Sequence, residues 1–127
     1  MIAVDTSALM AILGDEPEAD ACAEALDTDE RLLISAATVA EALIVAGRRD
    51  LGMDMAELID RAGLEIVGVS PAAAQRVAGA YAKWGKGVHP AALNFGDCFA
   101  YETAKTHDCP LLYVGRDFAQ TDVASVL

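Results

Sequence analysis

Four acidic residues stand at positions where carboxylates can do chemistry. They are Asp5, Glu41, Asp97 and Asp117. Glu41 is the most distinctive, because it is the only charged residue between Arg31 and Arg48 and lies within an apolar helical pattern. A helix that is apolar on every side is expected to be buried. A buried carboxylate is costly unless it is paired, neutralised or bound to a metal, so Glu41 is a candidate site residue. The alternatives are an exposed polar stripe or an ion pair with Arg48 or Arg49.

The other acids also have ordinary structural interpretations. Asp5 follows the apolar run Ile2–Val4 and is well placed to cap the next helix. Asp97 falls in the first turn of a predicted helix, where the helix dipole favours negative charge. Asp117 and Asp122 lie in a turn-rich segment, where Asp is common. Individually, these positions do not distinguish catalysis from capping.

In combination the acids indicate a metal site. Carboxylates gathered at one edge of a sheet repel one another, and a divalent cation stabilises such a cluster. Oxygen ligands of this kind suit Mg²⁺ or Mn²⁺. Twenty acidic and nine basic residues give a net charge of −11, the wrong sign for holding nucleic acid by surface charge alone. A bound cation would supply the missing positive field, although the charge also serves solubility.

The elements that must position these acids alternate between strands and helices. Strands are predicted at 2–4, 32–34, 65–69 and 111–114, with an edge-strand candidate in the apolar tail. Helices are predicted at 6–13, from Pro17, and at 36–49, 54–62, 70–84 and 95–107. This alternation predicts a single α/β domain over 1–127, with a parallel sheet covered on both faces. Ligands of such sheets lie beyond the carboxyl ends of the strands, where Asp5 and Asp117 fall.

Other chemistries have little support. The chain has no GxSxG, P-loop, GxGxxG or HExxH pattern, and its two histidines are not near a nucleophile motif. Its three cysteines form no CxxC pair, which argues against a disulfide framework or a zinc site. No apolar stretch is long enough for a membrane helix, and the N-terminus lacks a signal-peptide pattern. We therefore expect a cytoplasmic protein without a membrane partner.

Four segments resemble the PIN-domain ribonuclease toxins of the VapC type. They are Val4–Leu9, Ser35–Glu41, Leu93–Tyr101 and the stretch from Gly115 to Asp122. The motifs occur in family order, and the Asn-Phe-Gly-Asp-Cys block from Asn94 to Cys98 is the most specific. The resemblance implies a three-layer α/β/α fold with a central, mostly parallel sheet of four to five strands. It also implies Mg²⁺- or Mn²⁺-dependent hydrolysis of RNA, an antitoxin partner, a homodimer and a higher toxin–antitoxin assembly.

Carried over position by position, the resemblance assigns roles to the acids. Asp5 and Asp97 correspond to the principal metal ligands, and Glu41 and Asp117 complete an acidic quartet. Asp122 is a candidate auxiliary ligand.

The resemblance also draws attention to Thr6, Ser7 and Arg116. Thr6 or Ser7 would support Asp5 and help to position substrate. Arg116 stands where many relatives have Asn, so we expect it to alter RNA contacts or to pair with Asp117. The acidic surface also favours a basic antitoxin segment, with an Arg entering the carboxylate cluster.

Two rival functions stay open at this point. One is a PIN-like module that binds a partner protein without catalysis. The other is a metal-dependent phosphoryl-transfer domain built on an early Asp. A haloacid-dehalogenase-like site would have a second Asp at position 7, where this chain has Ser7. A receiver domain would have a pair of early acids, whereas only Asp5 is present.

Overall fold

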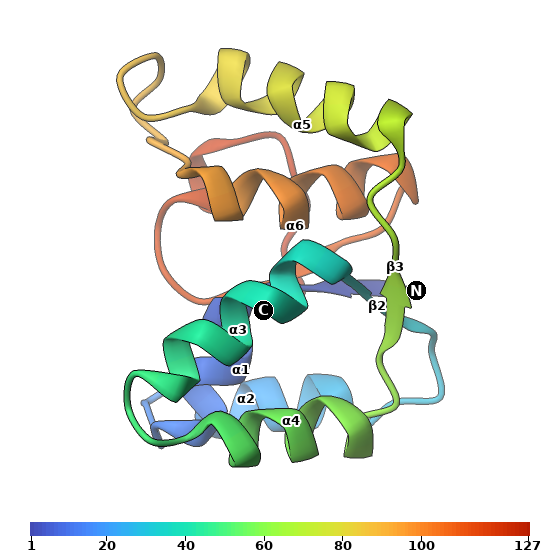
Figure 1. Cartoon of the computed structure of the whole chain (residues 1–127), viewed down its shortest axis with the longest axis vertical. Helices are drawn as coiled ribbons and strands as arrows, with labels where there is room; N and C mark the ends of the chain where they lie inside the picture. The colour runs from blue at the N-terminus through green and yellow to red at the C-terminus, as the bar shows by residue number, and fades with distance from the viewer.

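The computed structural model describes residues 1–127 as a sheet between two layers of helices (Figure 1). The strands are β1 (Ile2–Val4), β2 (Leu32–Ser35), β3 (Glu65–Val67) and β4 (Leu111–Leu112). The helices are α1 (Thr6–Leu13), α2 (Ala19–Leu26), α3 (Ala36–Gly47), α4 (Gly52–Arg61), α5 (Pro71–Trp84) and α6 (Phe95–Thr106), with a short 3₁₀ helix η1 (Phe118–Gln120). The predicted α/β class and three-layer arrangement are confirmed.

The four strands are parallel and lie in the order β3-β2-β1-β4. Figure 1 shows α5 and α6 on one side of the sheet and α1 to α4 on the other. Two hydrophobic cores lie on the two faces of the sheet, and β1 contributes residues to both. Ile2 and Val4 belong to the larger core, and Ala3 belongs to the other. This alternation is the expected geometry of a strand buried on both faces.

Two predicted strands are longer than the observed ones. β4 pairs only at Leu111 and Leu112, because β1 ends at Val4 and the chain then turns into α1. β3 ends at Val67, which pairs with Ser35 at the last position of β2. The predicted edge strand in the C-terminal tail is reduced to a single bridge between Ser125 and Leu111.

The sequence predicted that Pro17 opens the second helix, and this prediction is wrong. The Ala19 amide donates to the Glu16 carbonyl at 2.9 Å, which closes a turn over Pro17 and Glu18. α2 therefore begins at Ala19. The proline rigidifies the connection between α1 and α2 instead of starting a helix.

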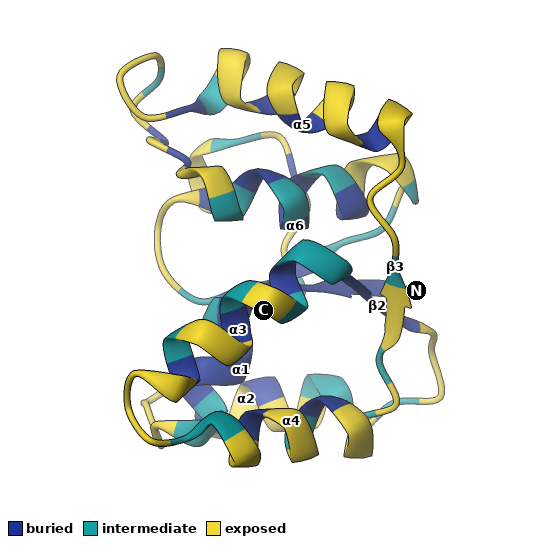
Figure 2. Ribbon diagram, in the orientation of Figure 1, coloured by how far each residue is buried: buried dark blue, intermediate teal, exposed yellow.

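The expectation that α3 is buried on every side is wrong. Its buried residues are Thr38, Ala42 and Ala46, whereas Ile44 is 57% exposed. Figure 2 shows this mixture of buried and exposed positions along α3. Apolar character in this helix therefore marks an uncovered surface as well as a core face. No helix combines the length and the apolar character that crossing a membrane requires.

Candidate active site

The fold brings together the four acids of the predicted quartet. Asp5 follows β1 and caps α1, Glu41 lies in the second turn of α3, and Asp97 lies in the first turn of α6. Asp117 follows β4 and precedes η1. Burial raises the pKa of Asp97 to about 7, and the charges of Asp5, Glu41 and Asp117 add to this rise. The four carboxylates are thus close enough to interact electrostatically.

Asp5 is the most deeply enclosed member of the group. Its side chain is only 3% exposed, and burial raises its pKa to about 6, with a contribution from the charge of Glu41. Oδ2 accepts hydrogen bonds from the backbone N–H and the hydroxyl of Ser7. The other oxygen, Oδ1, is buried without a partner. An unpartnered buried carboxylate oxygen is unfavourable unless a ligand completes its coordination.

Asp97 is held in a fixed orientation by a capping box. Its backbone N–H donates to Asn94 Oδ1 at 2.8 Å, and its own Oδ2 accepts from the Asn94 N–H at 3.0 Å. These reciprocal bonds satisfy two amides at the start of α6. One oxygen of the carboxylate is used in the cap, and the other has no hydrogen-bond partner in the fold.

Two hydroxyls orient the acids from α1. Thr6 donates to Glu41 Oε1 at 2.5 Å, although the two residues belong to different helices. Ser7 Oγ donates to Asp5 Oδ2 at 2.6 Å and accepts the Val114 N–H at 3.0 Å. The support expected for Asp5 comes from Ser7, whereas Thr6 contacts Glu41 instead. Ser7 also anchors the chain just before the segment that carries Asp117.

The last motif is open to solvent. Gly115, Arg116 and Asp117 are all exposed. Arg116 belongs to none of the five ion pairs of the structure, so it does not pair with Asp117. Its guanidinium is free to contact a ligand at this edge of the sheet.

Asp122 has a different environment from the quartet. Its Oδ1 accepts the Tyr101 hydroxyl at 2.6 Å, and Oδ2 lies 3.4 Å from Lys105 Nζ. The bond from Tyr101 lowers the pKa of Asp122, with help from the charge of Lys105. Tyr101 in turn accepts a bond from Trp84 Nε1 at 3.0 Å. This network connects α5, α6 and the C-terminal segment.

The donor set of the site consists of carboxylate oxygens, which suit a hard divalent cation. No group of three or more His, Cys, Asp or Glu side chains is placed so that it could hold a metal ion by itself. Mg²⁺ does not require one, because it is usually held by one or two carboxylates, with water and substrate phosphate completing the shell. The unpartnered Oδ1 of Asp5 and the raised pKa of Asp97 fit such an open site.

The sequence prediction missed Tyr101 as the partner of Asp122. No local signal identifies it, because 21 residues separate the two side chains. It also missed the capping box, for which a signal exists in the Asn-x-x-Asp spacing from Asn94 to Asp97.

The fold is that of a known class of domain. The family model for the PIN domain matches residues 2–124, and the chain belongs to this family. Among curated proteins, it is 41% identical over 126 residues to VapC ribonuclease Mb0640 of Mycobacterium bovis and to ribonuclease VapC30 of Mycobacterium tuberculosis. These matches cover 97% of this chain and 96% of each relative. Ribonuclease VapC36 of M. tuberculosis is 45% identical over 125 residues, covering 94% of this chain and 89% of the relative.

Solved structures show the same fold at low sequence identity. The structure of M. tuberculosis VapC20, described as a toxin that cleaves the sarcin–ricin loop, superposes with a TM-score of 0.81 at 12% identity. The superposition covers 99% of this chain and 98% of the VapC20 chain. A toxin–antitoxin complex from Klebsiella pneumoniae gives a TM-score of 0.73 at 20% identity, covering 96% and 93%.

Proposed function

We propose that this chain is a Mg²⁺-dependent endoribonuclease and the toxin of a toxin–antitoxin pair. The observation that carries the proposal is the enclosed Asp5 carboxylate, whose Oδ1 has no partner, beside Asp97, whose pKa is raised to about 7. The relatives named VapC ribonuclease, which align over nearly the whole chain, support the same activity.

Asp5 and Asp97 are the residues we propose as principal ligands of Mg²⁺, with Mn²⁺ as a substitute, and Glu41 and Asp117 as the remaining acids. A cation held there would supply positive charge to a phosphodiester and would lower the pKa of a water molecule beside it. The chain's own part is orientation, because Ser7 fixes Asp5 and Thr6 fixes Glu41. Such preorganised carboxylates need no rearrangement when substrate arrives.

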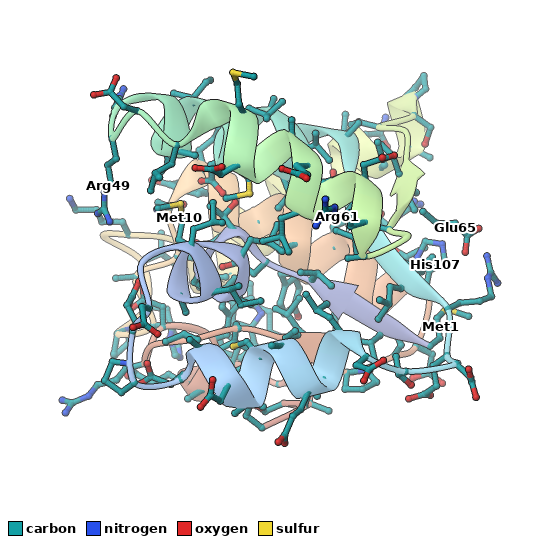
Figure 3. The ribbon with its side chains drawn as sticks, turned by 90° about the horizontal axis from the view of Figure 1, so that it is seen from below. Met1, Met10, Arg49, Arg61, Glu65 and His107 are labelled. Carbon is teal, nitrogen blue, oxygen red and sulfur yellow. The ribbon has the colours of Figure 1, made fainter.

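Basic residues near the acids support an RNA substrate. Arg48 directly follows α3, the helix that carries Glu41. Figure 3 places Arg49 at the end of the molecule opposite Met1, where β1 begins. Neither arginine belongs to an ion pair. Together with Arg116 they offer guanidinium groups for backbone phosphates around an otherwise acidic site.

An uncovered apolar face supports a homodimer. Five of the exposed large apolar side chains lie on α3, on α6 or around α5: Leu43, Ile44, Val69, Tyr81 and Phe95. Two clefts of about 460 Å³ each share Phe95 and Phe99 and so join across this face. Apolar surface of this kind marks an association site. We propose that a second copy covers it.

The antitoxin partner is proposed from the net charge of the chain as well as from its similarity to the VapC relatives. A net charge of −11 favours a basic antitoxin segment. An arginine of that segment would enter the carboxylate group and displace the cation.

The cellular compartment is proposed from the cysteines. All three are free thiols, which fits action in the reducing cytoplasm.

The test is 5′-end mapping of total bacterial RNA after incubation with antitoxin-free protein and Mg²⁺. Matched reactions contain a chelator, the Asp97→Asn variant, or the Asp108→Asn variant. Asp108 is exposed and has a positive φ of 49°, which Asn tolerates, so this control changes charge equally without touching the site. New ends that require Mg²⁺ and Asp97 but not Asp108 support the nuclease. Unchanged RNA from folded protein that also fails to bind Mn²⁺ would establish a binding module instead.

A further inference from the structure

The Glu41 carboxylate packs directly against the backbone of Gly96, the second residue of α6. A methyl group added at Gly96 would overlap Glu41 Oε2 and lie only 2.7 Å from Glu41 Cδ. The Thr6 hydroxyl contacts the other oxygen, Oε1, of the same carboxylate. Glu41 is therefore held between the first residue of α1 and the first turn of α6.

The three atoms nearest to a methyl group at position 96 all belong to Glu41, and the backbone conformation there does not require glycine. The φ of Gly96 is not in the left-handed region, since the positive-φ glycines are Gly63, Gly87 and Gly115. Within a helix, alanine is the better residue because glycine loses more backbone entropy on folding. The close approach of the Glu41 carboxylate is therefore the feature that the missing side chain serves.

We infer that Gly96 is a positioning residue for the ribonuclease reaction. Its missing side chain leaves the space that Glu41 occupies beside Asp97, the next residue of α6. The inference deepens the proposed function and rests on it for the reaction itself. The packing between residues 41 and 96 stands independently of that reaction. A side chain at position 96 would push the Glu41 carboxylate away from Thr6 and from the acidic group.

The experiment compares Gly96→Ala with Gly79→Ala. Gly79 is an exposed glycine inside α5, and a methyl group there would meet nothing within 4 Å. Both variants introduce the same residue into a helix, so propensity effects match. Displacing the Glu41 carboxylate breaks its bond to Thr6, so Gly96→Ala should melt about 5 °C below Gly79→Ala, bind Mn²⁺ roughly tenfold more weakly and cleave RNA roughly a hundredfold more slowly. Gly79→Ala should keep the affinity and the cleavage rate and should not lower the melting temperature.

A double-mutant cycle with Glu41→Ala isolates the contact. Removing the Glu41 carboxylate opens the space at position 96, so Gly96→Ala should cost no stability in that background. Adding Gly96→Ala to Glu41→Ala should also leave the Mn²⁺ affinity of the Glu41→Ala protein unchanged. If Gly96→Ala alone fails to fold, the double variant should fold again.

Three results would overturn the inference. They are an equal loss of stability in both backgrounds, a double variant that stays unfolded, and a Gly96→Ala protein that matches Gly79→Ala in every measurement. Failure of the proposed function would look different. In that case the wild-type protein cleaves no RNA, while the stability coupling between residues 41 and 96 persists.

Discussion

Ser7 donates a hydrogen bond from its hydroxyl to Asp5 Oδ2 at 2.6 Å, which makes it the closest polar partner of the most buried acid. The same hydroxyl accepts the backbone N–H of Val114 at 3.0 Å, from a residue 107 positions away. One oxygen atom thus joins the end of β1 to the chain that leaves β4. Together with the bond from the Asp5 N–H to the Leu112 carbonyl at 3.0 Å, this bridge sets the relative positions of Asp5 and the segment that carries Asp117.

Replacing Ser7 by alanine should therefore affect both stability and metal binding. The Val114 N–H loses its acceptor, and Asp5 loses one of its two hydrogen bonds from Ser7. We expect the free energy of unfolding to fall by about 1–3 kcal/mol, the usual cost of a part-buried group left unsatisfied. We also expect Mn²⁺ to bind about tenfold more weakly, because Asp5 is no longer fixed. Urea denaturation and Mn²⁺ titration measure the two effects.

Ser125→Ala is the matched control for this substitution. Its hydroxyl is exposed and donates only to the Leu127 carbonyl at 3.2 Å. This variant should behave as the wild-type protein in both measurements. Wild-type Mn²⁺ affinity in Ser7→Ala would contradict the orienting role of the hydroxyl.

The raised pKa values of two acids predict an unusual dependence of stability on pH. The pKa of Asp5 is about 6 and that of Asp97 about 7 in the folded protein, against an ordinary value of 3.8. Between about pH 4 and pH 7 the folded state therefore retains protons that the unfolded chain releases. Metal-free protein should lose stability as the pH rises through this window, by on the order of 5 kcal/mol for the two acids together.

Urea unfolding at pH 5 and pH 8 in the presence of a chelator measures this loss. Asp97→Asn should remove the larger part of it, because the amide does not titrate. Saturating Mg²⁺ at pH 8 should restore stability, since a ligand that binds only the folded state stabilises it. Stability that rises from pH 5 to pH 8 in the metal-free protein would show that the two acids are not desolvated.

The sequence allowed the positions of the main site residues within the fold to be predicted. Asp5 could be placed because a short apolar strand ends immediately before it, and Asp97 because it begins a helix. Parallel strands then require their carboxyl ends, and the acids that follow them, to share one edge. These inferences need only local patterns and the geometry of an α/β sheet.

The rest depends on contacts between distant segments, which local patterns do not encode. The apolar residues of α3 look the same whether they face a core or an uncovered surface, so Ile44 was expected to be buried and is exposed. The ends of β3 and β4 are set by where their neighbours stop, at Ser35 and Val4. The need for glycine at position 96 arises from a carboxylate 55 positions earlier in the chain.

Asp122 provides a test of whether a fifth acid takes part in metal binding. Its carboxylate accepts the Tyr101 hydroxyl and lies near Lys105. We expect Asp122→Ala to lower the free energy of unfolding by about 1 kcal/mol through loss of the bond to Tyr101. Tyr101→Phe should cause a larger loss, because it also removes the acceptor of the Trp84 Nε1–H, and both variants should keep the wild-type Mn²⁺ affinity. Weaker Mn²⁺ binding in Asp122→Ala but not in Tyr101→Phe would instead make Asp122 an auxiliary ligand.

The apolar face on α3 and α6 predicts a specific effect on assembly. Ile44→Glu places a charge in the middle of this face and should convert the homodimer to a monomer, because a buried unpaired charge is costly. Met53→Glu is the matched control, since Met53 is 90% exposed and lies on α4. Sedimentation velocity distinguishes the two states. A wild-type monomer, or a dimer that survives Ile44→Glu, would place any association elsewhere.

Arg116 should contribute to RNA binding without contributing to metal binding. It is exposed, belongs to no ion pair and stands next to Asp117. Arg116→Ala removes one cation from the path of the phosphates, so we expect KM for RNA to rise several-fold and the salt dependence of binding to fall by about one unit of slope. The Mn²⁺ affinity and kcat should stay unchanged. Arg61→Ala also removes one positive charge, but from a side chain already paired with Glu57 on α4. An equal rise in KM for both variants would mean that net charge alone governs RNA binding, whereas a rise confined to Arg116→Ala supports direct contact with the substrate.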